Sequence, residues 1–266
     1  MTGARKGDTM KHGDFTKLAD KYGKYRPMYA PFVLDTFTAL LKENISTKET
    51  ILCADVGAGT GIWSRQLAGK GMHINAVEPN DAMRDVGIQQ TGNLDITWHT
   101  GSAENTNLPD ASQDAVCMAS SFHWPDFDAA VREFNRILKP HGLFLALWNT
   151  RFYECNPLLV KIENHLHELL PNLNRVSSGR SEFCNHLTKN LTDRKEFKDV
   201  LYLEGRHIEK QSIERYIGLW ESVNDIRVQA GEDLFAKFLE FIRNETRGLE
   251  YIEAEYLTRA WIARKA

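Results

Sequence analysis

The chain has 266 residues, of which 42% are hydrophobic and 26% are charged, as in an ordinary globular protein. This length suits one α/β domain with a modest addition, and a core can form without metals or disulfides. A formal net charge of −3 argues against a surface for nucleic acid or an anionic membrane. No apolar run is long enough to span a membrane, so we expect a cytoplasmic protein without nucleic-acid or membrane partners.

The N-terminal part is predicted to contain a tail and then helices. Residues 1–14 are polar and mixed in charge, and we expect a flexible tail there. Residues 15–50 carry an apolar stripe at helical spacing that includes Phe32, Val33 and Phe37. We therefore predict that helices precede the main domain.

From residue 51 to residue 150, short apolar runs alternate with amphipathic segments. We predict strands at 51–56, 73–77, 96–99, 114–119 and 143–148. Between them we predict helices at 62–69, 82–90 and 127–138. This alternation indicates βαβ units in a doubly wound, mostly parallel sheet. The ligand site of such an α/β sheet lies outside the carboxyl ends of its strands.

The strict alternation ends after Trp148. We predict helices at 157–170, 213–223 and 232–244, with strands at 200–204 and 256–263. Residues 151–199 and 208–250 are expected to be helical cap insertions. Residues 200–207 and 251–266 are expected to supply the last strands of the core sheet, the final one antiparallel. The basic residues between 175 and 198 are interleaved with acids, which favours a solvated face over a surface that guides an acidic substrate.

Three glycines alternate with other residues directly after the first predicted strand, in the sequence D-V-G-A-G-T-G at 55–61. Glycines there permit a tight turn and a close approach of backbone to a ligand at a helix N-terminus. The pattern favours a nucleotide-like ligand. A dinucleotide fingerprint counted from Gly57 requires glycine or alanine where Ile62 stands, which argues against an NAD(P)-dependent oxidoreductase.

An acidic residue closes the second predicted strand of this region. Glu78 lies 19 residues after Gly59, where a carboxylate accepts hydrogen bonds from ribose hydroxyls in related sheets. The alternative is that Glu78 only caps the helix that begins near Asn80. The glycine-rich loop favours the ribose interpretation.

These residues resemble the class I S-adenosylmethionine-dependent methyltransferases, specifically the small-molecule group called methyltransferase type 11 and its trans-aconitate methyltransferase-like members. D-x-G-x-G-x-G at 55–61 resembles motif I, and V-E-P-N-D-A-M at 77–83 resembles the next motif. G-S-A-E at 101–104 is similar to the adenine-contacting segment. The resemblance implies a Rossmann-like fold, S-adenosylmethionine as cofactor, and contacts to it from Asp55, Gly57, Ala58, Gly59, Gly61, Glu78, Pro79, Met83, Ser102, Ala103, Glu104 and Ser120.

The segment before the first strand also resembles this family, in the pattern F-x-x-x-A-x-x-Y-x-x-Y-R-P-x-Y from Phe15 to Tyr29. The resemblance implies that this segment folds over the methionine end of the cofactor. Tyr22 and Arg26 are then expected to contact its carboxylate, which suits an arginine fork. The alternative is aromatic packing with a solvated arginine.

Several side chains follow the fourth and fifth strands, on the expected cleft side. His123 has the chemistry of a general base, and its alternative is a structural imidazole. Trp124 and Trp148 are expected either to wall the acceptor pocket or to pack between sheet and helices. Arg151 is expected either to pair with a substrate carboxylate or to lie on the surface. Methyl transfer depends mainly on positioning, so the sequence needs no catalytic triad.

Three kinds of function compete at this stage. The first is methyl transfer to oxygen, nitrogen or a carboxylate of a small molecule, by a monomer or homodimer. The second is methylation of nucleic acid or protein, and the third is a silent cofactor-binding module. No spacing of histidines with acids indicates a metal site. The cap insertions suit a lid over a small acceptor and favour the first function.

Overall fold

The computed structural model describes residues 15–44, 50–175 and 179–266, so the predicted tail at 1–14 lies outside the described residues. Within them the chain forms a seven-stranded sheet in the order β3-β2-β1-β4-β5-β7-β6. The strands are β1 (Leu52–Val56), β2 (His73–Val77), β3 (Ile96–His99), β4 (Gln113–Ala119), β5 (Leu138–Arg151), β6 (Phe197–Ser212) and β7 (Tyr251–Lys265). β7 runs antiparallel to both of its neighbours, and β1 to β5 pair in parallel. The predicted Rossmann-like doubly wound fold is confirmed.

Helices cover both faces of the sheet. They are α1 (Ala19–Tyr25), α2 (Pro31–Asn44), α3 (Ile62–Ala68), α4 (Asp81–Thr91), α5 (Phe127–Ile137), α6 (Pro157–Leu169), α7 (Glu182–Thr192), α8 (Ile213–Glu221) and α9 (Asn224–Glu245), with short 3₁₀ turns at Thr16–Leu18 and Tyr153–Cys155. Buried residues of α2 and α3 pack on one face, and those of α5 and α7 pack on the other. The outcome is a three-layer α/β/α core.

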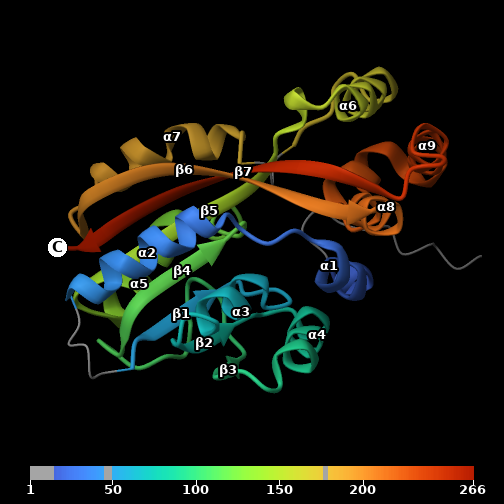
Figure 1. Cartoon of the computed structure of the whole chain (residues 1–266). Coiled ribbons are helices and arrows are strands. Elements are labelled where there is room, and N and C mark those ends of the chain that lie inside the picture. The colour runs from blue at the N-terminus through green and yellow to red at the C-terminus, as the bar shows by residue number, and fades with distance from the viewer. Residues whose placement is uncertain (1–14, 45–49, 176–178) are drawn as a thin grey trace, which may run out of the picture.

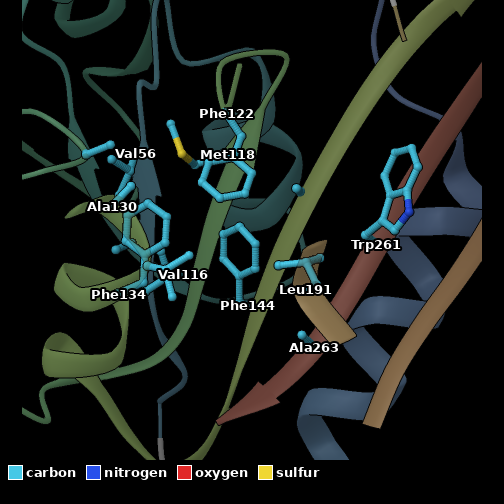
Figure 2. Packing of buried hydrophobic residues seen from close by; sticks show 14 of the residues in the cluster. Val56, Val116, Met118, Phe122, Ala130, Phe134, Phe144, Leu191, Trp261 and Ala263 are labelled. Atoms are coloured by element: carbon cyan, nitrogen blue, oxygen red, sulfur yellow. The ribbon is translucent and has the colours of Figure 1, made fainter. Parts of the chain in front are cut away.

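The face beneath α5 and α7 is rich in aromatic residues. Phe134 of α5 stacks on Phe144 of β5 with ring centroids 5.2 Å apart, and both side chains are fully buried. Figure 2 shows these rings packed beside Val116, with Leu191 and Trp261 near the neighbouring strands. Burying such side chains stabilises the core by about 1.5–3 kcal/mol each.

Helix α7 differs from the sequence prediction for its segment. The sequence indicates only a basic, polar stretch at 175–198, yet residues 182–192 form a helix. Its Cys184, Leu187 and Leu191 are buried in the same apolar cluster as the central strands. They recur at helical spacing among polar residues, which conceal the stripe. α7 is therefore part of the layered core although it lies within the predicted cap segment.

Helices α6, α8 and α9 form a separate group beyond one end of β6 and β7 (Figure 1). They share an apolar cluster of their own, centred on Trp220 of α8 and Phe238 of α9, whose rings meet edge to face at 4.9 Å. β5 reaches this group through Arg151, whose guanidinium lies 3.6 Å from the centroid of the Trp220 ring. We call α6, α8 and α9 the cap. In the part of the chain that the structure covers, none of the helices is both long and apolar enough to cross a membrane.

Candidate functional site

The glycine-rich loop joins β1 to α3 in a conformation that favours glycine. Gly57, Gly59 and Gly61 have φ angles of 67°, 59° and 76°, a region in which side chains with a Cβ are strained. The backbone N–H groups of Gly57 and Ala58 donate to the carbonyl of Val77 at 2.8 and 3.1 Å. These bonds hold the loop against the end of β2, so the loop and Glu78 face the same space.

The Glu78 carboxylate is fixed by the loop itself. One of its oxygens accepts the backbone N–H of Gly59 at 2.8 Å, and the other accepts that of Asn80 at 2.9 Å. Burial raises the pKa of Glu78, while these two N–H groups and Arg84 oppose the rise. Asn80 caps α4 through its own side chain, which accepts from the backbone of Met83. The helix is thus capped by Asn80, which leaves Glu78 available at the wall of a cavity.

A cavity of about 360 Å³ opens at the carboxyl ends of β1 to β4, as the fold predicts for a ligand site. Most of the predicted cofactor residues line it: Tyr22, Arg26, Gly57, Gly59, Glu78, Pro79, Met83, Ser102, Ala103, Glu104 and Ser120. Trp124 also lines it. The structure therefore brings together residues of the sheet side, from Gly57 to Trp124, and residues of the N-terminal segment.

Three predicted cofactor residues lie outside the described lining of this cavity, namely Asp55, Ala58 and Gly61. Asp55 is fully buried beneath the loop and accepts the hydroxyl of Ser64 at 2.6 Å. Burial raises the pKa of Asp55 to about 7, and the Ser64 hydrogen bond limits the rise. Asp55 thus holds the first turn of α3 to the end of β1.

His123 and Trp148 are also placed behind the cavity wall. The indole N–H of Trp148 donates to Nδ1 of His123 at 3.3 Å, and Trp148 packs edge to face on Trp261 in the core. Burial lowers the pKa of His123 to about 4. His123 lies outside the described lining of the cavity, so the structure favours the structural interpretation for both residues.

Arg151 does not reach the first cavity but lines a second one, of about 380 Å³. Its Nε lies 3.0 Å from an oxygen of Glu163 of α6. The second cavity shares Arg26, Pro27 and Asn149 with the first, so the two adjoin. The alternative of a surface arginine does not hold, because the Arg151 side chain is only 15% exposed.

The sequence prediction missed several cavity residues. Asn224 and Asp225 begin α9 and are the cap's contribution to the first cavity, and both are buried. Their place depends on how the cap packs, which no local pattern reveals. Tyr29 also lines the cavity, and its hydroxyl lies 3.0 Å from that of Ser120. Tyr29 belongs to the N-terminal pattern that held Tyr22 and Arg26, so that signal was present in the sequence.

The described residues contain no group of three or more histidine, cysteine or acidic side chains placed to hold a metal ion. The N-terminal segment instead brings Arg26 over Tyr22, with the guanidinium 4.6 Å from the ring centroid. Arg26 also donates from one Nη to the carbonyl of Ser222, which ties this segment to the cap. The site is therefore built from polar and aromatic groups.

Comparison with known proteins agrees with this geometry. Residues 54–146 match the family described as the methyltransferase domain. The chain is 28% identical to an uncharacterized methyltransferase of Schizosaccharomyces pombe, over 94% of this chain and 96% of that protein. It is 32% identical to one from Mycobacterium tuberculosis, over 57% of either chain. A crystallised protein from Anaeromyxobacter dehalogenans assigned as a type II methyltransferase superposes with a TM-score of 0.62 at 20% identity, over 91% of this chain and 97% of that one.

The fold, the glycine-rich loop and the matches to known methyltransferases together identify the chain as a Rossmann-like class I methyltransferase. It is an S-adenosylmethionine-dependent enzyme of that class, as the glycine loop and Glu78 indicate. None of the matches singles out the trans-aconitate methyltransferase-like group, which stays a prediction.

Proposed function

We propose that this enzyme transfers a methyl group to an oxygen, nitrogen or carboxylate of a small-molecule acceptor bound between the sheet and the cap. The observation that carries the proposal is the 360 Å³ cavity, whose walls include the glycine loop and the first residues of α9. A space of this size suits a cofactor and part of a small acceptor.

The donor side of the cavity fits S-adenosylmethionine. Glu78 carries a buried carboxylate that can accept from ribose hydroxyls, and Arg84 donates to its backbone carbonyl rather than neutralising it directly. Gly59 lies opposite Met83, and a Cβ added to Gly59 would come within 3.3 Å of the Met83 methyl group. We propose that Pro79, Met83 and the 102–104 segment border the adenine.

The N-terminal segment completes the donor side of the proposed site. Arg26 has a buried Nε without a hydrogen-bond partner among the described residues. A guanidinium with an unused N–H donor suits the carboxylate in the methionine part of the cofactor. Tyr22 lies next to this guanidinium. We propose that Tyr22 and Arg26 hold that carboxylate.

The protein contributes position and exclusion of water. When bound, S-adenosylmethionine would supply an electrophilic methyl group on a sulfonium, whose sulfur leaves with the carbon–sulfur electron pair. Trp124 and the cap residues Asn224 and Asp225 bound the space in which an acceptor would be oriented. We assign no base role to His123, because it lies behind the wall and its pKa is lowered to about 4.

A labelled-methyl assay tests the proposal. The full chain is incubated with methyl-labelled S-adenosylmethionine and a cell extract, and the label is then separated by ultrafiltration. We expect the label in the small-molecule filtrate. Label retained with protein or nucleic acid, and released by protease or nuclease, would contradict the small-molecule acceptor. Calorimetric titration with S-adenosylmethionine and with NADH tests the donor, and binding of NADH alone would contradict the whole proposal.

A further inference from the structure

The second cavity lies between the end of β5, residues 173–175 and 180–182, and the cap, and it has an unusual lining. Four arginines reach it, Arg26, Arg151, Arg175 and Arg180, against two glutamates, Glu163 and Glu182. Glu182 is 83% exposed and pairs with His186 on the outside of α7. The inner wall is therefore dominated by guanidinium groups.

The carboxylates near this wall do not outnumber the arginines. Arg151 pairs with Glu163, and Arg175 has its Nε 3.4 Å from an oxygen of Asp225. Arg180 pairs with Glu154 at 2.6 Å, and Arg26 lines the cavity and donates to the carbonyl of Ser222. Among the described residues, four guanidiniums thus meet three paired carboxylates in a partly buried region, which leaves one positive charge in excess before any ligand binds. Buried charge of one sign is costly unless an opposite charge compensates it.

The direction of the pKa shift of Arg175 agrees with this excess of positive charge. Burial lowers the pKa of Arg175, and the neighbouring charges of Arg151 and Arg26 lower it further, against Asp225 and Glu163. The three guanidiniums are therefore close enough to repel one another. An anion in the cavity would relieve that repulsion.

A neutral donor completes the wall. The hydroxyl of Thr150 is buried and has no hydrogen-bond partner within the described parts of the chain. Thr150 is the next-to-last residue of β5 and lines the cavity next to Arg151. Gly179 packs so tightly on Thr150 that a Cβ there would come within 2.3 Å of the hydroxyl. This contact brings the segment that carries Arg180 against β5.

We propose that the second cavity is an anion subsite that binds a carboxylate or phosphate group of the acceptor, with Arg151, Arg175 and Thr150 as its ligands. The proposal rests on the proposed function, because it assumes that the adjoining first cavity holds the donor. An acceptor anchored here by its anionic group would extend past Arg26 and Asn149, which line both cavities, toward the donor. The acceptors are thus small organic acids or phosphate esters with a second nucleophilic group.

Calorimetry on the full chain, with saturating S-adenosylhomocysteine, tests this inference directly. The probes are succinate, inorganic phosphate and the neutral analogue succinamide. We expect one of the anions to bind at least about tenfold more tightly than succinamide, as charge-assisted hydrogen bonds to arginine imply. Stronger binding of succinate indicates carboxylate acceptors, and stronger binding of phosphate indicates phosphate esters.

Variants show where the anion binds. Arg175→Gln is expected to weaken anion binding at least about tenfold, and Arg175→Lys to restore most of it, since the charge remains. The matched control is Arg243→Gln, an arginine of α9 that is 52% exposed and pairs with Glu221. This control is expected to bind the anion like the unmodified chain. Thr150→Val replaces only the hydroxyl and is expected to weaken anion binding by a smaller factor. This variant tests the site if Arg175→Gln does not fold.

Two results separate this inference from the function on which it rests. Normal binding of S-adenosylhomocysteine with no preference for either anion over succinamide would overturn the anion subsite alone. Equal loss of anion binding in Arg243→Gln and Arg175→Gln would also overturn it. Failure to bind S-adenosylhomocysteine would overturn the proposed function itself.

Discussion

The donor half of the molecule and its cap are built on different principles. In residues 51–150, the proposed donor residues lie at strand ends or in the loops that follow them, except Met83 in the first turn of α4, so the sheet fixes their positions. In the cap, Asn224 and Asp225 reach the cavity only because α9 packs on α6 and α8 through a separate apolar cluster. The donor half therefore depends on backbone geometry, whereas the cap depends on side-chain packing.

The largest effect is expected from breaking the packing of the cap. Trp220 is fully buried there, so Trp220→Ala should cost about 3–5 kcal/mol of cap stability. Because the donor half has its own core, the variant should still bind S-adenosylhomocysteine while methyl transfer is lost. Hydrogen exchange with mass spectrometry, combined with calorimetry, measures both.

The control for the cap is Leu249→Ala, since Leu249 is 46% exposed and the change should stay within about 0.5 kcal/mol. Loss of protection across β1 to β4 in Trp220→Ala would show that cap and donor half unfold as one unit. The comparison between the two regions would then fail.

Cofactor binding by the donor half is impaired most selectively by changing the carboxylate of Glu78. Glu78→Gln keeps the shape of the side chain but removes the charge that is proposed to bind the ribose hydroxyls. Two charge-assisted hydrogen bonds at about 1.5 kcal/mol each imply an affinity for S-adenosylhomocysteine about 100-fold lower. Calorimetry measures the change. Asp81→Asn, at an exposed neighbour, is the control, and equal affinities in Glu78→Gln and this control would refute the ribose role.

The pH dependence of the unfolding free energy at Asp55 provides a further test of the donor half. The pKa of Asp55 is raised to about 7 from 3.8, so the folded state binds this proton more tightly than the unfolded state. Its contribution to the free energy of unfolding therefore falls as pH rises from about 4 to about 7. His123 acts in the opposite direction, because its pKa is lowered from 6.5 to about 4, and its contribution rises over that window.

Asp55→Asn isolates the first effect. The difference in unfolding free energy between this variant and the unmodified chain should change by up to about 1.4 kcal/mol per pH unit between pH 4 and 7. Urea unfolding at several pH values gives this difference. Parallel pH profiles for the two proteins would show that the buried carboxyl of Asp55 does not titrate in this window.

The smallest effect is expected at Trp124, which borders the cavity and is 43% exposed. Trp124→Ala should raise the KM for the acceptor about tenfold, roughly 1.4 kcal/mol, through lost contact area. The affinity for S-adenosylhomocysteine should stay unchanged. Steady-state kinetics with calorimetry separates the two, and a selective loss of donor affinity would move Trp124 to the donor side.

Local patterns were sufficient to predict the donor half. The apolar runs at 73–77 and 96–99 match β2 and β3 residue for residue, because short apolar runs alternate with amphipathic helices in βαβ units. The glycines at 57, 59 and 61 predicted a tight turn after the first strand, and the structure has positive φ angles at all three.

Positions that depend on tertiary packing could not be predicted in the same way. A strand directs successive side chains to opposite faces, so the Trp148 indole points into the core although its neighbour Asn149 lines the cavity. The polar residues around Leu187 and Leu191 hid helix α7. The arginines at 175 and 180 were interpreted as part of a solvated face, because no local pattern shows that they line a cavity beside the cap.

The register of the last two strands has an evolutionary consequence. Ser212, where β6 ends, pairs directly with Tyr251, where β7 begins. The two ends of the segment 213–250 are therefore attached to the sheet side by side. A segment attached in this way can be lengthened, shortened or exchanged between paralogues at little cost to the sheet. Changes confined to this connection would alter the cavity wall that Asn224 and Asp225 form, while the strand-end residues proposed to bind the donor stay the same.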